Sequence, residues 1–87
     1  MKILFIGCVH SSVVLLNELL QVKEVSVVGV ISKSKSEINA DFESLIPLAQ
    51  KNNIPFFDYA QSKDIKSWLT NIDADYLYCI GWSHILS

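Results

Sequence analysis

Arginine is absent from this 87-residue sequence, and glycine, proline and cysteine are scarce, with three, two and two residues. Seven lysines against nine acidic residues give a formal net charge of −2, which argues against a basic nucleic-acid-binding surface. No apolar run approaches the ~20 residues of a transmembrane helix. No small-residue cleavage pattern follows the apolar start, so we expect no signal peptide and a cytoplasmic protein.

The two cysteines, Cys8 and Cys79, stand at the ends of apolar segments and have neither a CxxC partner nor metal-ligand spacing. We therefore expect two reduced thiols and no metal site, with a disulfide between them as the alternative. The glycines form neither a G-x-G-x-x-G nor a Walker A motif, so the usual dinucleotide and P-loop sites are not expected.

The sequence is rich in apolar residues whose spacing alternates between two periods. Apolar runs of strand length predict four strands, and segments with helical spacing between them predict three helices. The strands are expected within 2–7, 25–32, 54–59 and 73–81, and the helices within 11–22, 44–53 and 62–72. Ser11 or Ser12 is expected to cap the first helix and Ser62 the third, and Asn53 to end the second with a left-handed conformation.

The order strand–helix–strand predicts one α/β domain over residues 1–87, with a parallel sheet covered by helices. In a Rossmann-like order 3-2-1-4, the first and fourth strands are neighbours. Their carboxyl ends then flank the switch point at which ligands bind in open α/β sheets. The ligand-binding residues are therefore expected in the segments that follow Gly7 and Ile80.

The first of these segments, GCVHSS, is a strand-to-helix turn with an imidazole and two hydroxyls. Helix N-termini attract anions because their N–H groups and dipole are positive, so the turn could bind phosphate. In the alternative interpretation, Ser11 and Ser12 only cap the helix, and His10 is a solvated loop residue.

The second segment, GWSHILS, follows the fourth strand and also has two interpretations. Trp82, Ile85 and Leu86 could be core residues that cover the end of the sheet, with His84 incidental. Alternatively, Trp82 and Leu86 form the walls of a flat apolar pocket. Backbone groups of Ser83, His84 and Leu86 would then bind a planar heterocycle.

Three stretches taken together, MKILFIG, LAQKNNIPFF and ADYLYCIGWSHILS, resemble the formyltransferase N-terminal domain family. Its members include methionyl-tRNA formyltransferase, glycinamide ribonucleotide formyltransferase and the nucleotide-sugar N-formyltransferases. The similarity runs in register over the whole chain, with Asn53 where the family often has glycine. The HSS turn, together with NADF before the second helix, is closest to the sugar-formyltransferase branch.

In that family the G-aromatic-x-x-I-L segment forms part of the pocket for the pteridine of 10-formyltetrahydrofolate, and the loop after the first strand holds the acceptor, often by its phosphate. The folate-binding residues that the resemblance implies are Gly81, Trp82, Ser83, His84, Ile85 and Leu86. The acceptor-binding residues that it implies are Cys8, His10, Ser11 and Ser12.

The catalytic set of the family is an Asn and a His from an N-x-H-P-type segment, with a later Asp. Neither His10 nor His84 has that context, so we assign no catalytic residue. We expect the chain to be the N-terminal half of a formyltransferase domain, truncated and inactive alone. The complete enzyme would bind folate and an amine acceptor, of an amino sugar nucleotide or methionyl-tRNA. The fragment itself is expected to bind no membrane and no nucleic acid.

The fourth strand is central in a complete domain of this family, which implies that here it has an exposed edge. We therefore expect a homo-oligomer through that strand.

Two alternatives to a formyltransferase belong to other classes of protein. The first is a non-catalytic Rossmann-like module that binds folate, a nucleotide or a partner. The second, a flavodoxin-like or response-regulator-like domain, is disfavoured because no acidic cluster follows the first strand.

Overall fold

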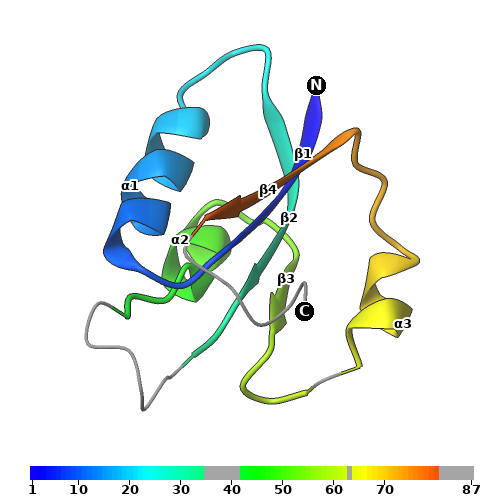
Figure 1. The fold of residues 1–87 in the computed structure, drawn as a ribbon. Coiled ribbons are helices and arrows are strands. Elements are labelled where there is room, and N and C mark those ends of the chain that lie inside the picture. Colours follow the sequence, from blue (N-terminus) through cyan, green and yellow to red (C-terminus); the bar gives the residue numbers. More distant parts are fainter. Residues whose placement is uncertain (35–41, 63, 81–87) are drawn as a thin grey trace.

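The computed structural model describes residues 1–34, 42–62 and 64–80. Within those ranges the chain forms four strands and three helices (Figure 1). In order they are β1 (Lys2–Gly7), α1 (His10–Leu19), β2 (Ser26–Ser32), α2 (Ile46–Lys51), β3 (Phe56–Asp58), α3 (Ile65–Leu69) and β4 (Tyr76–Ile80). The strands pair in parallel in the order β3-β2-β1-β4. The predicted fold class and strand order are confirmed.

Strand β1 is the centre of the fold because it pairs with β2 on one side and β4 on the other. Its alternate residues therefore enter two cores. Phe5 packs with residues of α1 and α2 on one face, whereas Leu4 and Ile6 pack with residues of α3 on the other. The result is a sheet with α1 and α2 on one face and α3 on the other, as a parallel sheet requires.

Gly29 in β2 lies directly under α3. A Cβ atom at this position would be 3.0 Å from Trp68 Cη2 and 3.1 Å from Leu4 Cδ1. The Trp68 ring also contacts Phe57, with ring centroids 5.7 Å apart. The absence of a side chain at Gly29 thus lets the indole approach the sheet closely.

Two of the predicted helix starts are wrong. Val9 is the N-cap residue of α1, so Ser11 and Ser12 lie within the first turn instead of preceding it. Asp64 is the N-cap residue of α3, and Ser62 precedes it, its Oγ accepting the Asp64 N–H at 3.1 Å. In both cases the serine hydroxyl bonds to a neighbouring backbone group of the turn, which lets the helix begin at another residue.

Helix α2 has the features that its sequence indicates. Pro47 lies in its first turn, where a missing N–H has no cost, and the helix begins at Ile46. Asn53 follows the helix with a φ of 56°, the predicted left-handed conformation. The chain then enters β3, an edge strand of the described sheet, which Pro55 precedes. No helix in the described ranges has the length and apolar character needed to cross a membrane.

Asn53 should tolerate glycine better than alanine. Asn53→Ala should lower the free energy of unfolding by about 1 kcal/mol, because a Cβ disfavours positive φ and alanine lacks the polar side chain that eases this conformation in asparagine. Asn53→Gly should be neutral or slightly stabilising. Urea denaturation of the two variants checks this, with Gln50→Ala as a control at an exposed residue of α2. Equal losses for alanine and glycine at position 53 would contradict it.

Candidate functional site

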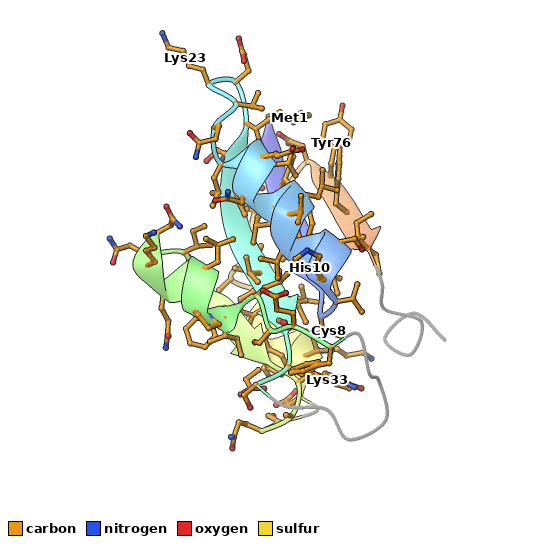
Figure 2. The ribbon with its side chains drawn as sticks, turned by 90° about the vertical axis from the view of Figure 1, so that its left-hand side faces the viewer. Met1, Cys8, His10, Lys23, Lys33 and Tyr76 are labelled. Carbon is orange, nitrogen blue, oxygen red and sulfur yellow. The ribbon has the colours of Figure 1, made fainter. Side chains whose placement is uncertain are left out.

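The carboxyl ends of β1 and β4 lie side by side at the switch point of the sheet. Gly7, the last residue of β1, pairs with Ile80, the last residue of β4. Helix α1 begins three residues after Gly7, so its N-terminus lies at the same edge. Figure 2 shows Cys8, His10 and Lys33 toward this end of the molecule, with Met1 and Lys23 at the other.

Ser12 holds the switch point together. Its hydroxyl donates to the Ile80 carbonyl at 2.8 Å and accepts the Val9 N–H at 3.3 Å, and its side chain is fully buried. A Cβ on Gly7 would lie 2.6 Å from Ser12 Oγ and 2.7 Å from the Ile80 oxygen. A single serine therefore links the first turn of α1 to the end of β4 and to the turn that follows β1, in a contact that leaves no room for a side chain at Gly7.

The two neighbouring serines consequently have different environments. Ser11 is exposed in the first turn of α1, where a bound anion could reach its hydroxyl. Ser12 uses its hydroxyl within the fold. Acceptor binding by Ser12 stays a prediction, and it would require the hydroxyl to exchange its bond to Ile80 for one to the ligand.

His10 is paired with Glu43, a residue that the sequence analysis did not single out. His10 Nδ1 lies 2.7 Å from Glu43 Oε1. An ionised carboxylate only accepts hydrogen bonds, so with Glu43 ionised Nδ1 carries the proton. Glu43 is held in place because its N–H donates to the Cys8 carbonyl at 2.9 Å and Phe42 forms a β-bridge to Val9.

Cys8 is a buried thiol beside a cation at the same edge. Burial raises the pKa of the Cys8 thiol, Lys33 lowers it in part, and Cys79 adds to the rise. Burial also raises the pKa of Cys79. Both residues are thiols, as expected. Lys33, which follows β2, is therefore a second charged residue of the switch point that sequence inspection did not identify.

The charged groups at this edge have opposite effects on the binding of an anion. The α1 N-terminus and Lys33 favour an anion, whereas Glu43 disfavours one. Protonation of His10 would offset the Glu43 carboxylate, so the site should accept phosphate more readily when His10 is charged. Across the described part of the chain, no cluster of three His, Cys, Asp or Glu side chains could hold a metal ion.

The residues of the predicted folate pocket, 81–86, lie outside the described residues. The structure describes the residue that immediately precedes them in the sequence, Ile80 at the end of β4. That residue is beside the end of β1 and the start of α1.

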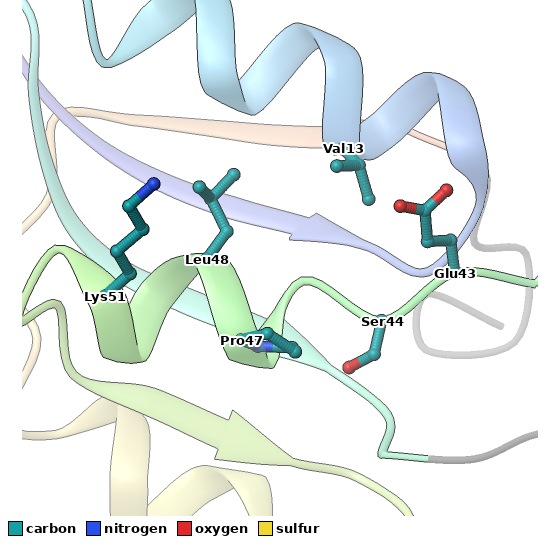
Figure 3. Close-up of a pocket in the computed structure, with 6 residues that line it drawn as sticks. All are labelled: Val13, Glu43, Ser44, Pro47, Leu48 and Lys51. Atoms are coloured by element: carbon teal, nitrogen blue, oxygen red, sulfur yellow. The ribbon is translucent and has the colours of Figure 1, made fainter.

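A surface groove of about 390 Å³ lies between α1 and α2 (Figure 3). Its lining consists of Val13, Glu43, Ser44, Pro47, Leu48 and Lys51. Val13 points from α1 and Leu48 from α2 into the groove, while Glu43 closes the end toward the switch point. The carboxylate that pairs with His10 therefore also borders an apolar surface.

Comparison with known proteins identifies no relative: no protein-family model, curated protein or solved structure matches this chain.

Ser12 and Ser11 should differ in their effect on stability. Ser12→Ala should lower the free energy of unfolding by about 1–3 kcal/mol, because it removes the partner of the buried Val9 N–H and of the partly buried Ile80 carbonyl. Ser11→Ala, its exposed neighbour, should change the free energy by no more than about 0.5 kcal/mol. Urea denaturation followed by circular dichroism measures both. Similar losses for the two variants would contradict the role assigned to Ser12.

The raised pKa of each thiol should slow its alkylation. Because less thiolate is present at neutral pH, iodoacetamide should label Cys8 and Cys79 slowly, with rates that still increase above pH 9. Lys33→Met removes the cation that favours the Cys8 thiolate and should slow labelling of Cys8 by roughly twofold. Peptide mass spectrometry separates the two sites. Lys23→Met, at the opposite end of the sheet, is the control, and faster labelling in Lys33→Met would contradict the assignment.

Proposed function

We propose that this chain forms the first four strands of a 10-formyltetrahydrofolate-dependent formyltransferase domain in the cytoplasm. Its reaction is formyl transfer to a primary amine, of an amino sugar nucleotide in the first instance and of methionyl-tRNA as the alternative. The chain supplies binding groups for both substrates. The Asn, His and Asp that carry the chemistry in the family have no counterpart in its sequence.

One observation supports the proposal above the others. The two segments that the resemblance assigns to acceptor and folate follow Gly7 and Ile80. These two residues are 73 positions apart in sequence and are paired neighbours in the sheet. A formyl donor and an amine must meet for the carbon to pass from one nitrogen to the other. Adjacent binding segments at one switch point satisfy that requirement.

The described residues have distinct roles in this proposal. The N–H groups at the start of α1, with Ser11 and Lys33, bind an anionic group of the acceptor such as a phosphate. Cys8 contributes to the wall of the acceptor site. Glu43 orients His10 through Nδ1.

A non-catalytic ligand-binding module is the second candidate, because the sequence has no N-x-H-P-type segment. Both candidates allow ligand binding. The first requires that folate is a ligand, whereas the second also allows a nucleotide or a partner in place of folate. Neither predicts formyl transfer by these 87 residues alone, and turnover abolished by His84→Ala would contradict the roles assigned here.

Titration with 5-formyltetrahydrofolate, a stable isomer of the cofactor, tests the proposal. Calorimetry should detect binding to the chain, and Trp82→Ala should weaken it by about tenfold or more, because stacking on an aromatic ring contributes about 1–3 kcal/mol per base in comparable sites. Val22→Ala, an exposed apolar residue at the other end of the sheet, is the control.

Two results would count against folate binding: no heat with the wild type, or equal affinity in Trp82→Ala. Inorganic phosphate, added separately, should raise the melting temperature of the wild type and do so less in Ser11→Ala. Glu43→Gln should strengthen the phosphate response because it removes the opposing carboxylate, and Glu24→Gln, remote from the site, should leave it unchanged.

A further inference from the structure

The two cysteines of the chain meet at the switch point. Cys8 follows the last residue of β1, and Cys79 is the last residue but one of β4, so they are 71 positions apart in sequence. Cys79 pairs with Ile6, and Cys8 is two positions beyond Ile6. Alternate residues of a strand share a face, and both thiols pack in the cluster on the α3 face of the sheet. Cys8 and Cys79 are therefore diagonal neighbours on one face.

The electrostatic environment of Cys8 agrees with this placement. Burial makes the largest contribution to its raised pKa, Lys33 lowers that pKa in part, and the Cys79 thiolate adds to the rise. A charge affects a neighbouring group in this way only at short range. The sequence has no third cysteine, so oxidation within one chain can join only these two thiols.

The two thiols differ in their access to solvent. Cys8 is only 7% exposed, whereas Cys79 is partly exposed, so a reagent from solution reaches Cys79 first. Lys33 lies at the same end of the molecule as Cys8 (Figure 2), and its charge favours the Cys8 thiolate. The pair thus combines an accessible thiol with a buried second thiol whose ionisation is assisted by a cation.

We propose that Cys8 and Cys79 are a redox pair, which closes to an intrachain disulfide when it meets a disulfide oxidant such as glutathione disulfide. The Cys79 thiolate attacks one sulfur of glutathione disulfide, forms a mixed disulfide and releases one glutathione thiolate. The Cys8 thiolate then attacks the Cys79 sulfur and releases the second. The two protons of the protein thiols pass to the two glutathione thiolates. Glutathione disulfide is thereby reduced as the pair is oxidised, and excess glutathione reverses the reaction.

Closure of the bond moves the turn that follows β1. Diagonal neighbours on one face of a strand pair lie about 7–8 Å apart, whereas a disulfide holds its two Cα atoms about 4.4–6.8 Å apart. Cys8 therefore shifts toward β4 when the bond forms. Its carbonyl accepts the Glu43 N–H at 2.9 Å, and the next residue, Val9, donates to Ser12 Oγ at 3.3 Å. The shift thus reaches the His10–Glu43 pair and the start of α1, and the switch point has a reduced and an oxidised arrangement.

Glutathione redox buffers test whether the fold favours the bond. The chain is brought to equilibrium with reduced and oxidised glutathione and quenched with acid, and peptide mass spectrometry measures the fraction that carries the Cys8–Cys79 bond. The equilibrium constant should be at least about tenfold higher for the native chain than for the chain in urea, because the fold already holds the thiols together. Cys8→Ser and Cys79→Ser should each form only a mixed disulfide with glutathione.

Two results would overturn the redox pair. The first is an equilibrium constant no higher in the native chain than in urea, which would mean that the fold keeps the thiols apart. The second is a bond between two chains in place of the bond within one. Lys33→Met should slow closure of the native pair by roughly twofold, because the Cys8 thiolate loses its cation. Lys23→Met, at the opposite end of the sheet, should leave the rate unchanged.

Amide NMR spectra of the reduced and oxidised chain test the movement of the turn. The signals of Val9, His10 and Glu43 should shift on oxidation, because the Cys8 backbone is bonded to Glu43 and precedes the start of α1. The signals of Val22 and Lys23, between α1 and β2, should stay in place. Closure of the bond with no shift at Val9, His10 and Glu43 would show that the two redox states have the same arrangement, and would overturn the switch.

Discussion

The hydrogen bond from the Ser12 hydroxyl to the Ile80 carbonyl is the contact on which the arrangement of the switch point depends. It joins the first turn of α1 to the last residue of β4, and the absence of a side chain at Gly7 allows the two to approach. The bond fixes where α1 begins relative to the sheet. It thereby also fixes the direction in which the helix N-terminus and Ser11 face.

Much of the fold could be predicted from the conformational properties of single residue types. Asn53 tolerates positive φ, Pro47 suits a first turn, and Gly29 permits a close approach, and each of these properties belongs to one residue type whatever its distant surroundings. Strand β1 was predicted with the observed bounds, because a short apolar run that ends in glycine is compatible with few secondary structures other than a buried strand. A chain in which strands and helices alternate commonly forms a parallel sheet with the strand order 3-2-1-4.

The contacts that sequence inspection missed join residues far apart in the chain. Ser12 bonds to a residue 68 positions away, and His10 to one 33 positions away. A serine before a helix is usually a cap, and nothing in its neighbours indicates that its hydroxyl serves another strand. Glu43 and Lys33 are likewise single charges in polar stretches. Only the folded chain brings them to the edge where Cys8 and His10 lie.

The pairing of β1 with β4 has a consequence for how the protein is made. Ile3 pairs with Tyr76, so the central strand acquires its second neighbour only when nearly the whole described chain is available. Contacts between residues so far apart in sequence form slowly, because closing the large loop between them costs conformational entropy before the contact is made. During synthesis on the ribosome, β1, α1 and β2 can assemble first, with one flank of β1 uncovered. The nascent chain therefore passes through a stage in which the backbone N–H and C=O groups on that flank have no partner strand.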